Sequence, residues 1–318
     1  MLQPSDLHIV VVHFNPNRWA SHRRLRLEFL ARYQNCGAPI HVVELAMGER
    51  DFEVVDAKNP FHHGLRTSVE VPWVKESLIN YAIRKLPHDA RYVAWIDGDV
   101  IFTNPNVIMD TLHELQHAPV VQMFSECLDV GPSRQAIPGE RGGADFIRDG
   151  FAKLHVEDRK GFSPRSGYRR EHCGYAWAAR LDFLRRLDPH NPLIDWSIIG
   201  AADWQMACNL IARADLAFHG ALKSSFLARN ETWAKRAFAY GGKDISYVKG
   251  LLIHEFHGLK QNRNYVGRWN LLIEHRFDPD LDVAHRSDGL IQWTGRNRPL
   301  ELAFRDHSRA RNEDSIDT

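Results

Sequence analysis

The chain has 318 residues, of which 44% are hydrophobic and 25% are charged, a composition that predicts a packed core rather than disorder. Its formal net charge of +1 argues against a protein that binds nucleic acid or anionic membranes through its overall charge. A local basic patch is compatible with this net charge. No apolar run approaches the ~20 residues that span a bilayer, so we expect no transmembrane segment.

The N-terminal segment and the cysteines indicate where in the cell the protein is expected. The first apolar stretch lacks the basic residues that precede a signal sequence, so we expect a cytoplasmic protein. The cysteines form no CxxC pair, which argues against a zinc ribbon or a thioredoxin-like motif and predicts buried, reduced thiols. They are Cys36, Cys127, Cys173 and Cys208.

Strands and helices alternate through the first half of the chain. A β-branched apolar run at 7–14 predicts a central parallel strand, 21–33 an amphipathic helix, and 39–46 a second strand. This order favours a parallel sheet with functional loops at the carboxyl ends of its strands. A helix within 71–87 then leads to a strand at 91–96.

A further helix at 103–115 and a strand at 119–124 follow, and then the pattern breaks. Residues 131–170 mix glycine, proline and arginine without periodicity, which predicts an irregular insertion or lid. Order returns at 172, and the polar C-terminus at 309–318 is expected to fray. The later elements expected are a helix at 200–214, a strand at 247–256 and a helix at 262–275.

The strand at 91–96 runs directly into two acids, Asp97 and Asp99, separated by Gly98. The glycine allows the backbone to leave the strand abruptly and turn both carboxylates toward a common point. Two adjacent carboxylates repel and need a cation, and Mg²⁺ and Mn²⁺ prefer oxygen ligands. A solvated acidic turn is the alternative, but the buried segments on both sides make an unpaired charge costly there. A metal that bridges to a diphosphate explains the pattern.

This motif resembles the DxD motif of GT-A-type glycosyltransferases, especially the group around β1,4-galactosyltransferases and polypeptide N-acetylgalactosaminyltransferases. In that family it ends a central strand and holds Mn²⁺ on the diphosphate of a nucleotide sugar. The resemblance implies that Asp99 is a direct metal ligand and that Asp97 contacts the metal or the ribose. It also implies an α/β fold of GT-A (Rossmann-like) type, with a mixed, mostly parallel central sheet flanked by helices.

The segments before the motif resemble the nucleotide-binding part of this family. The resemblance implies that Phe14, Asn15 and Arg18, after the first strand, lie near the base or ribose. It further implies that Lys75 and Asn80 face the nucleotide, whereas an ordinary surface lysine is the alternative for Lys75.

The segment "HCGYAWAAR" is similar to the stretch that lines the sugar and acceptor pocket of the family. It implies that Gly174, Tyr175, Ala176 and Trp177 line the pocket, whereas core packing is the alternative and is favoured for Ala176.

The segment "IGAADWQMA" is similar to the one that carries the general base of inverting enzymes. Asp203 occupies that place and would also bind the acceptor, but Ala202 stands where the family has glutamate, which puts the donor-sugar contact in question. A helix-capping role is the alternative for Asp203.

Two histidines lie near the end of the strand expected at 247–256: His254 is within this range and His257 directly follows it. The resemblance implies that one of them completes the metal site, and we select His257 over His254 because it lies next to a glycine. Lys260 and Arg263 would then pair with phosphate oxygens. A zinc site is a weaker alternative because the HExxH context is missing. The commonest alternative for either histidine is an ordinary surface residue without a metal.

Together these segments predict a single GT-A-like domain. Its expected parts are a nucleotide-binding half at 1–130, an insertion or lid at 131–171, an acceptor and catalytic half at 172–275 and a C-terminal extension at 276–318. The expected activity is glycosyl transfer from a nucleotide sugar, with UDP as the expected nucleotide and Mn²⁺ or Mg²⁺ as cofactor.

The acceptor, which can be a glycan, lipid, protein or nucleic acid, is not assigned by the sequence, and neither is the oligomeric state. A nucleotidyltransferase is one alternative, although "NPNRWASHR" after the first strand lacks the expected glycines. A non-catalytic GT-A-like module that binds sugar or nucleotide is the other, and Ala202 is its best support.

Overall fold

The computed structural model describes residues 1–137, 146–159, 162–164, 171–241, 243–265 and 267–316. A seven-stranded sheet forms its centre, in the order β11-β6-β10-β4-β1-β2-β3. Strand β10 runs antiparallel to both of its neighbours, and the other pairings are parallel, so the predicted mixed, mostly parallel sheet is confirmed. The strands are β1 (Leu7–Phe14), β2 (Ile40–Met47), β3 (His62–Thr67), β4 (Tyr92–Ile96), β6 (Val120–Gln122), β10 (Ala176–Arg180) and β11 (Ile245–Tyr247).

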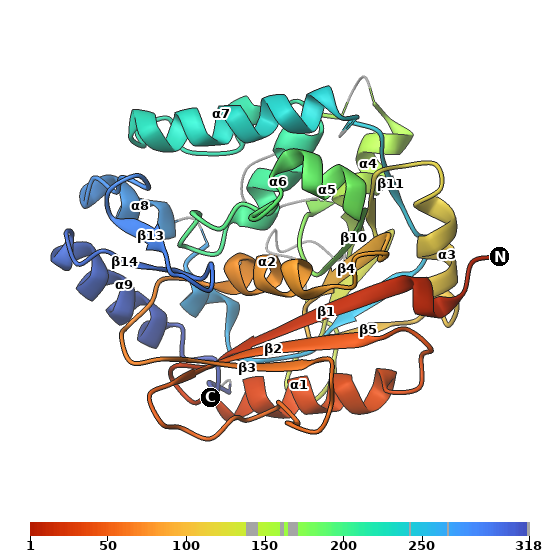
Figure 1. Ribbon diagram of the computed structural model, residues 1–318, viewed down its shortest axis with the longest axis horizontal. Coiled ribbons are helices and arrows are strands. Elements are labelled where there is room, and N and C mark those ends of the chain that lie inside the picture. Colours follow the sequence, from red (N-terminus) through yellow and green to blue (C-terminus); the bar gives the residue numbers. More distant parts are fainter. Residues whose placement is uncertain (138–145, 160–161, 165–170, 242, 266, 317–318) are drawn as a thin grey trace.

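Helices cover both faces of this sheet. Helix α1 (Ala20–Tyr33) lies on one face and α2 (Lys75–Lys85) on the other (Figure 1). Strand β1 is therefore apolar on both faces: Val11 packs into the core that contains Phe29, and Val10 into the core that contains Leu78. This double burial explains why the run at 7–14 lacks the alternation of a half-exposed strand.

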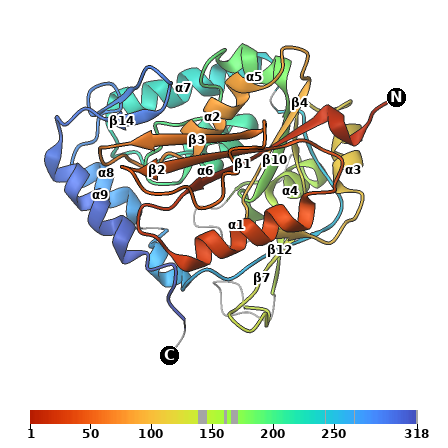
Figure 2. The same cartoon turned by 60° about the horizontal axis from the view of Figure 1, so that its bottom comes forward.

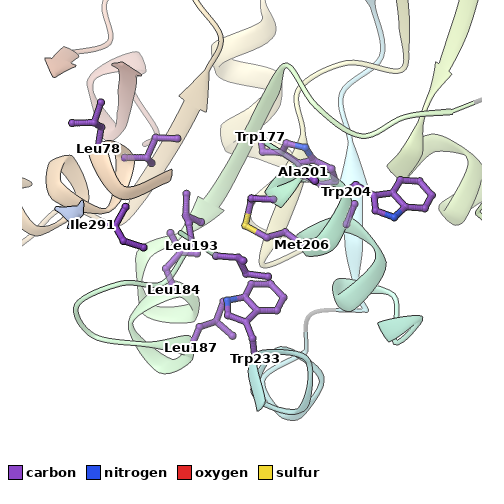
Figure 3. Packing of buried hydrophobic residues seen from close by; sticks show 14 of the residues in the cluster. Leu78, Trp177, Leu184, Leu187, Leu193, Ala201, Trp204, Met206, Trp233 and Ile291 are labelled. Carbon is purple, nitrogen blue, oxygen red and sulfur yellow. The ribbon is translucent and has the colours of Figure 1, made fainter. Parts of the chain in front are cut away.

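The larger core continues away from the sheet into a helical layer. Trp177, Leu184, Met206 and Trp233 pack together there (Figure 3). Other helices of the described chain are α3 (Val107–Glu114), α4 (Phe151–Glu157), α5 (Leu181–Leu187), α6 (Ala202–Leu210), α7 (Ser224–Ala239), α8 (Arg268–Glu274) and α9 (Arg298–Ala310).

A second sheet, in the order β5-β12-β7-β8-β9, gathers polar residues beside the acidic motif. In its register, His254 lies opposite Val100 on one side and Asp129 on the other. The strands are β5 (Val100–Phe102), β7 (Glu126–Asp129), β8 (Ile147–Gly150), β9 (Glu171–His172) and β12 (Leu251–His254), and β13 (Val283–His285) pairs separately with β14 (Ile291–Trp293).

The structure corrects two sequence expectations about irregular segments in part. The expected insertion at 131–170 contains β8 and α4, whereas its residues 138–145, 160–161 and 165–170 lie outside the described residues. The C-terminal segment is not frayed through 311–315, because Arg311 and Glu313 are buried against other parts of the chain. The cysteines are free, three of them buried. Within the described residues, no helix is both long and apolar enough to cross a membrane.

Candidate functional site

The site lies where the strand order of the main sheet changes direction. Strand β1 has β2 on one side and β4 on the other, so the chain runs outward from β1 both ways. In such sheets, ligands bind beyond the carboxyl ends of the strands at this switch point. A cavity of about 350 Å³ lies there and is lined by ten of the predicted site residues. They are Phe14, Lys75, Asp97, Asp99, Gly174, Tyr175, Asp203, His257, Lys260 and Arg263.

Two of the predicted site residues lie instead in the core. The amide of Asn80 donates to the carbonyl of Leu193 at 3.1 Å and accepts from its N–H at 3.0 Å, because this face of α2 packs inward. Trp177 packs in the core shown in Figure 3, and its Nε1 donates to the carbonyl of Cys173 at 2.7 Å. Core packing, the alternative weighed for this stretch, therefore describes Trp177.

The structure also places Asn15 and Arg18 outside the cavity. Asn15 is buried and accepts a hydrogen bond from the N–H of Trp19 at 2.9 Å, and its amide donates to Glu53 at 2.9 Å. Arg18 lines a neighbouring surface pocket. Both residues shape the loop after β1, and Phe14 alone of these three reaches the cavity.

Three side chains converge into a group with the donor set of a metal site. One ligand atom each from Asp99, His254 and His257 lies within 4.8 Å of the others. The two histidine Nε2 atoms are 3.1 Å apart, and Asp99 Oδ2 is 3.4 Å from His257 Nε2. Two ligands about 2.1 Å from one ion, at a right angle to each other, are roughly 3.0 Å apart. The spacing of the two imidazoles therefore fits adjacent ligands of one divalent cation.

The remaining ring nitrogens of these histidines are held by carboxylates. His254 Nδ1 is 2.9 Å from Asp129 Oδ1, and His257 Nδ1 is 2.5 Å from Glu313 Oε2. A ring that donates from Nδ1 to a carboxylate keeps its Nε2 lone pair for a metal. Burial and the Arg263 guanidinium lower the pKa of His257 to about 3, so this ring is neutral at physiological pH, as a metal ligand must be.

The carboxylate of Asp99 completes the cluster. Its Oδ1 is shielded from solvent and has no hydrogen-bond partner among the described residues. Burial raises the pKa of Asp99, but His257, His254 and the Arg26 guanidinium outweigh burial and hold this pKa well below its usual value. An ionised oxygen that finds no hydrogen-bond partner in the described chain, with His254 Nε2 3.9 Å away, is the observation that most directly fits a bound cation.

Asp97 does not join this cluster. Its Oδ1 lies 2.5 Å from Lys75 Nζ. Burial lowers the pKa of Lys75, but the Asp97 carboxylate outweighs burial and raises this pKa above its usual value, so the ammonium stays charged. The structure thus gives Asp97 a different partner from Asp99 and makes Lys75 a member of the site rather than an ordinary surface lysine.

Arg26 explains the glycine between the two acids. The Arg26 side chain lies against Gly98, where a Cβ atom would be 1.8 Å from its Nη1 and 2.5 Å from its Cδ. Nε and Nη1 of Arg26 are shielded from solvent and find no hydrogen-bond partner in the described part of the chain. A guanidinium with unused donors therefore lines the cavity beside the acidic motif.

Tyr175 connects the cluster to its surroundings. Its backbone has a φ of +73°, and its ring stacks on His172 at 3.7 Å and on His254 at 4.6 Å between centroids. Its hydroxyl donates to Asp129 Oδ1 at 2.6 Å. Because Asp129 also pairs with Lys260 and Arg148, this carboxylate organises much of the wall behind His254.

Asp203 lies close to Gly174 at another part of the cavity wall. A Cβ atom on Gly174 would be 2.6 Å from Asp203 Oδ2, so the absence of a side chain there permits the approach. Helix α6 begins at Ala202, which makes Asp203 its second residue rather than its N-cap, and Oδ1 accepts from the N–H of Trp204 at 2.8 Å. The structure thus brings the predicted base and Gly174 together.

The sequence interpretation missed several residues of the site. Asp129 ends a short strand as Asp97 follows one, so the rule that singled out Asp97 could have found it. Arg26 lies on an ordinary-looking amphipathic helix, and Glu313 lies in a polar tail, so neither carries a local signal. His254 was the less favoured of two histidines, and the structure brings both to the cluster.

No family model matches the chain, and no curated protein matches it. Among solved structures, it is similar to glucosyl-3-phosphoglycerate synthase from Mycobacterium tuberculosis in complex with Mn²⁺, UDP and phosphoglyceric acid (13% identity, 85% of this chain, 76% of that chain, TM-score 0.41). It is also similar to Drosophila β1,4-galactosyltransferase 7 with manganese, UDP-Gal and xylobiose (11%, 93% and 98%, TM-score 0.42). A third structure is mannosyl-3-phosphoglycerate synthase from Rubrobacter xylanophilus (12%, 90% and 83%, TM-score 0.41). At these values the likeness assigns no activity to this chain.

Proposed function

We propose that this protein is a divalent-metal-dependent glycosyltransferase of the GT-A type that uses a nucleotide-sugar donor, with UDP as the nucleotide. The observation that carries the proposal is the cluster of Asp99, His254 and His257 at the switch point of the sheet, in which one Asp99 oxygen has no hydrogen-bond partner among the residues that the structure describes. The resemblance of the DxD segment to the family supports the same activity.

In this proposal Asp99, His254 and His257 hold Mn²⁺ or Mg²⁺. When bound, the cation neutralises charge that develops on the diphosphate leaving group. Phe14 lies at the carboxyl end of β1 and is the candidate contact for the base.

The basic side chains differ in how free they are to bind phosphate. Lys75 is paired with Asp97, Lys260 with Asp129, and Arg263 donates to Tyr265 at 3.0 Å. Arg26 has unused donors, so it is the strongest candidate for a direct contact with the diphosphate. Positive groups fixed around a developing negative charge lower the barrier because they need no rearrangement during the reaction.

Asp203 is the candidate general base of an inverting reaction. Its carboxylate would take the proton of the acceptor hydroxyl while that oxygen bonds to the anomeric carbon and the bond from that carbon to the diphosphate oxygen breaks. The electron pair of the broken bond stays on the diphosphate. Gly174 and Tyr175 form the wall beside Asp203 where sugar and acceptor would bind.

The proposal includes a cytoplasmic location, which the free cysteines support.

The test is calorimetric titration of UDP into the protein with Mn²⁺, repeated with EDTA and with the Asp99→Asn variant. We expect binding that depends on the metal and is lost in the variant, whereas the exposed control Asp89→Asn binds as the wild type does. UDP-sugars would then be screened for UDP release. Release of pyrophosphate from a nucleoside triphosphate instead would identify a nucleotidyltransferase, and binding without turnover would identify a non-catalytic module. Absence of nucleotide binding with metal present would refute the donor site.

A further inference from the structure

The C-terminal segment 311–315 is built into the wall of the site. It leaves α9 and passes the start of α1 (Figure 2), where the Asp314 carboxylate accepts from the N–H groups of Ala20 at 2.7 Å and Ser21 at 2.8 Å. These are N–H groups that the first turn of a helix leaves without partners. Asp314 therefore anchors the end of the chain to α1.

The same segment packs closely against the loop that carries His257. Gly258 has a φ of +87°, and a Cβ atom on it would lie 2.6 Å from the Cα atom of Glu313. On the other side of this contact, the N–H of Leu259 donates to Ser315 Oγ at 3.0 Å. The glycine after His257 is thus explained by the close approach of the C-terminal backbone.

Glu313 is 1% exposed, and both of its carboxylate oxygens are in use. Oε1 accepts from Arg311 Nε at 2.5 Å, and Oε2 lies 2.5 Å from His257 Nδ1 and 2.6 Å from His22 Nε2. Its Oε1 is thus paired with the Arg311 guanidinium, and Oε2 faces the two imidazoles as a hydrogen-bond acceptor.

A carboxylate that is paired with Arg311 and lies 2.5 Å from His257 Nδ1 favours the tautomer with the proton on Nδ1 and the lone pair on Nε2. Nε2 faces Asp99 Oδ2 at 3.4 Å, and Arg263 Nη2 also approaches Nε2, at 3.1 Å. Asp129 holds His254 in the same manner on the opposite side of the cluster. Each histidine of the cluster is thus backed by its own carboxylate.

We propose that Glu313 is a positioning residue of the metal site, which fixes the tautomer and the orientation of His257 from the far end of the chain. The inference rests on the proposed function, because it concerns the same metal site. It adds that the segment 311–315 is part of that site, so truncation before Arg311 would impair metal binding although Glu313 itself is not a metal ligand in this proposal.

His22, His257 and Glu313 also bring ligand atoms within 4.8 Å of one another and so could hold a second cation. Two ligands of one cation would lie roughly 3.0 Å apart, whereas His257 Nδ1 and His22 Nε2 lie 2.5 and 2.6 Å from Glu313 Oε2. These short distances indicate direct hydrogen bonds and favour the positioning role. The number of ions bound per chain separates the two arrangements.

Two measurements test the proposal. Binding of Mn²⁺ in the presence of UDP is followed by the loss of the electron paramagnetic resonance signal of the free ion, in the wild type, Glu313→Gln and Asp314→Asn. Nitrogen–proton correlation spectra of the imidazoles, recorded without metal, report which ring nitrogen of His257 carries the proton, with its signal assigned by its loss in His257→Asn. Thermal melting checks that each variant is folded.

We expect one Mn²⁺ per chain, an affinity roughly 10–100-fold weaker in Glu313→Gln, and a smaller loss in Asp314→Asn, which loosens the anchor to α1 but keeps Glu313. His257 should carry its proton on Nδ1 in the wild type and shift toward Nε2 in Glu313→Gln. Glu313→Asp, which keeps the charge beside Arg311 but is one methylene shorter, serves as a second variant if Glu313→Gln does not fold.

Wild-type affinity and an unchanged tautomer in Glu313→Gln would overturn the positioning role while leaving the proposed function intact. A proton on Nε2 of His257 in the wild type would overturn it without any variant. Two ions per chain, one of them lost with Glu313, would establish the second cation instead. A wild type that binds no Mn²⁺ with UDP present would overturn both this inference and the proposed function.

Discussion

Adding one methyl group at Gly98 should weaken nucleotide binding because it displaces Arg26. The Cβ atom of an alanine at this position would lie 1.8 Å from Arg26 Nη1, 2.5 Å from its Cδ and 2.6 Å from its Cζ, so the whole end of the side chain must move. Gly98 has no positive φ, so steric contact rather than backbone strain is the cause. The variant therefore removes the guanidinium from its place without changing its charge.

The expected loss follows from the contact that Arg26 would make. A hydrogen bond to a charged group contributes about 1.5–3 kcal/mol. At about 1.4 kcal/mol for each factor of ten in affinity, UDP should bind roughly 10–150-fold more weakly to Gly98→Ala with Mn²⁺ present. Arg26→Ala should show a loss of the same size, because it removes the same contact.

A double-mutant cycle separates this cause from a general disturbance of the acidic motif. Calorimetric titration of UDP is compared across the wild type, Gly98→Ala, Arg26→Ala and the double variant, with Gly220→Ala, where the added Cβ meets open space, as the control. If both single variants act through the displaced guanidinium, the double variant should bind about as weakly as either one. Additive losses, or wild-type affinity in Gly98→Ala, would refute the reasoning.

Three further predictions concern other parts of the molecule. Asp203→Asn should lower kcat roughly 10²–10⁴-fold with little change in UDP affinity if Asp203 is the base, and an unchanged kcat would exclude that role. Asn80→Ala should lower the free energy of unfolding by about 1–3 kcal/mol, because it leaves two buried backbone groups of Leu193 without these partners. The UDP affinity of this variant should equal that of the wild type. A loss of UDP binding without a loss of stability would instead place Asn80 in the nucleotide site. Burial, with smaller effects of His8, His63 and His62, lowers the pKa of His41 from 6.5 to about 4. The unfolded chain therefore takes up the proton first, and stability is full above pH 6.5 and falls as the pH drops toward 4, by up to about 3 kcal/mol at 1.36 kcal/mol per pKa unit. Denaturant unfolding should show this slope reduced in His41→Gln and unchanged in the exposed control His88→Gln, and equal slopes in all three would contradict the assignment.

The order of the elements and the position of the metal motif could be predicted because their causes are local. Apolar runs such as 7–14 and 91–96 specify buried strands by themselves, and Asp97 and Asp99 follow one of them directly. The resemblance implied that Phe14 lies near the nucleotide, and the structure brings it to the same cavity as the acidic motif, because the carboxyl ends of neighbouring parallel strands meet at one edge.

The roles of individual residues within this frame depend on which way each side chain points. Asn80 and Lys75 lie on the same helix, yet Lys75 reaches the cavity and Asn80 is buried against Leu193. Trp177 lies two residues from Tyr175, which lines the cavity, and it packs in the core instead. Residues only a few positions apart along the chain therefore point either into the site or into the core. A resemblance between whole segments does not show which residue points which way.

The three glycines of the site show why the remaining residues were out of reach. From the sequence alone, Gly98 indicates an abrupt turn, and Gly258 serves only to distinguish His257 from His254. In the structure, Gly98, Gly174 and Gly258 are each explained by a close neighbour: Arg26, Asp203 and the backbone of Glu313. Each neighbour is distant in sequence from its glycine, so a glycine indicates that something approaches but not what it is. Arg26 and Glu313 become visible only when the partner that occupies the space of the absent Cβ is known, and both then belong to the candidate metal and diphosphate site.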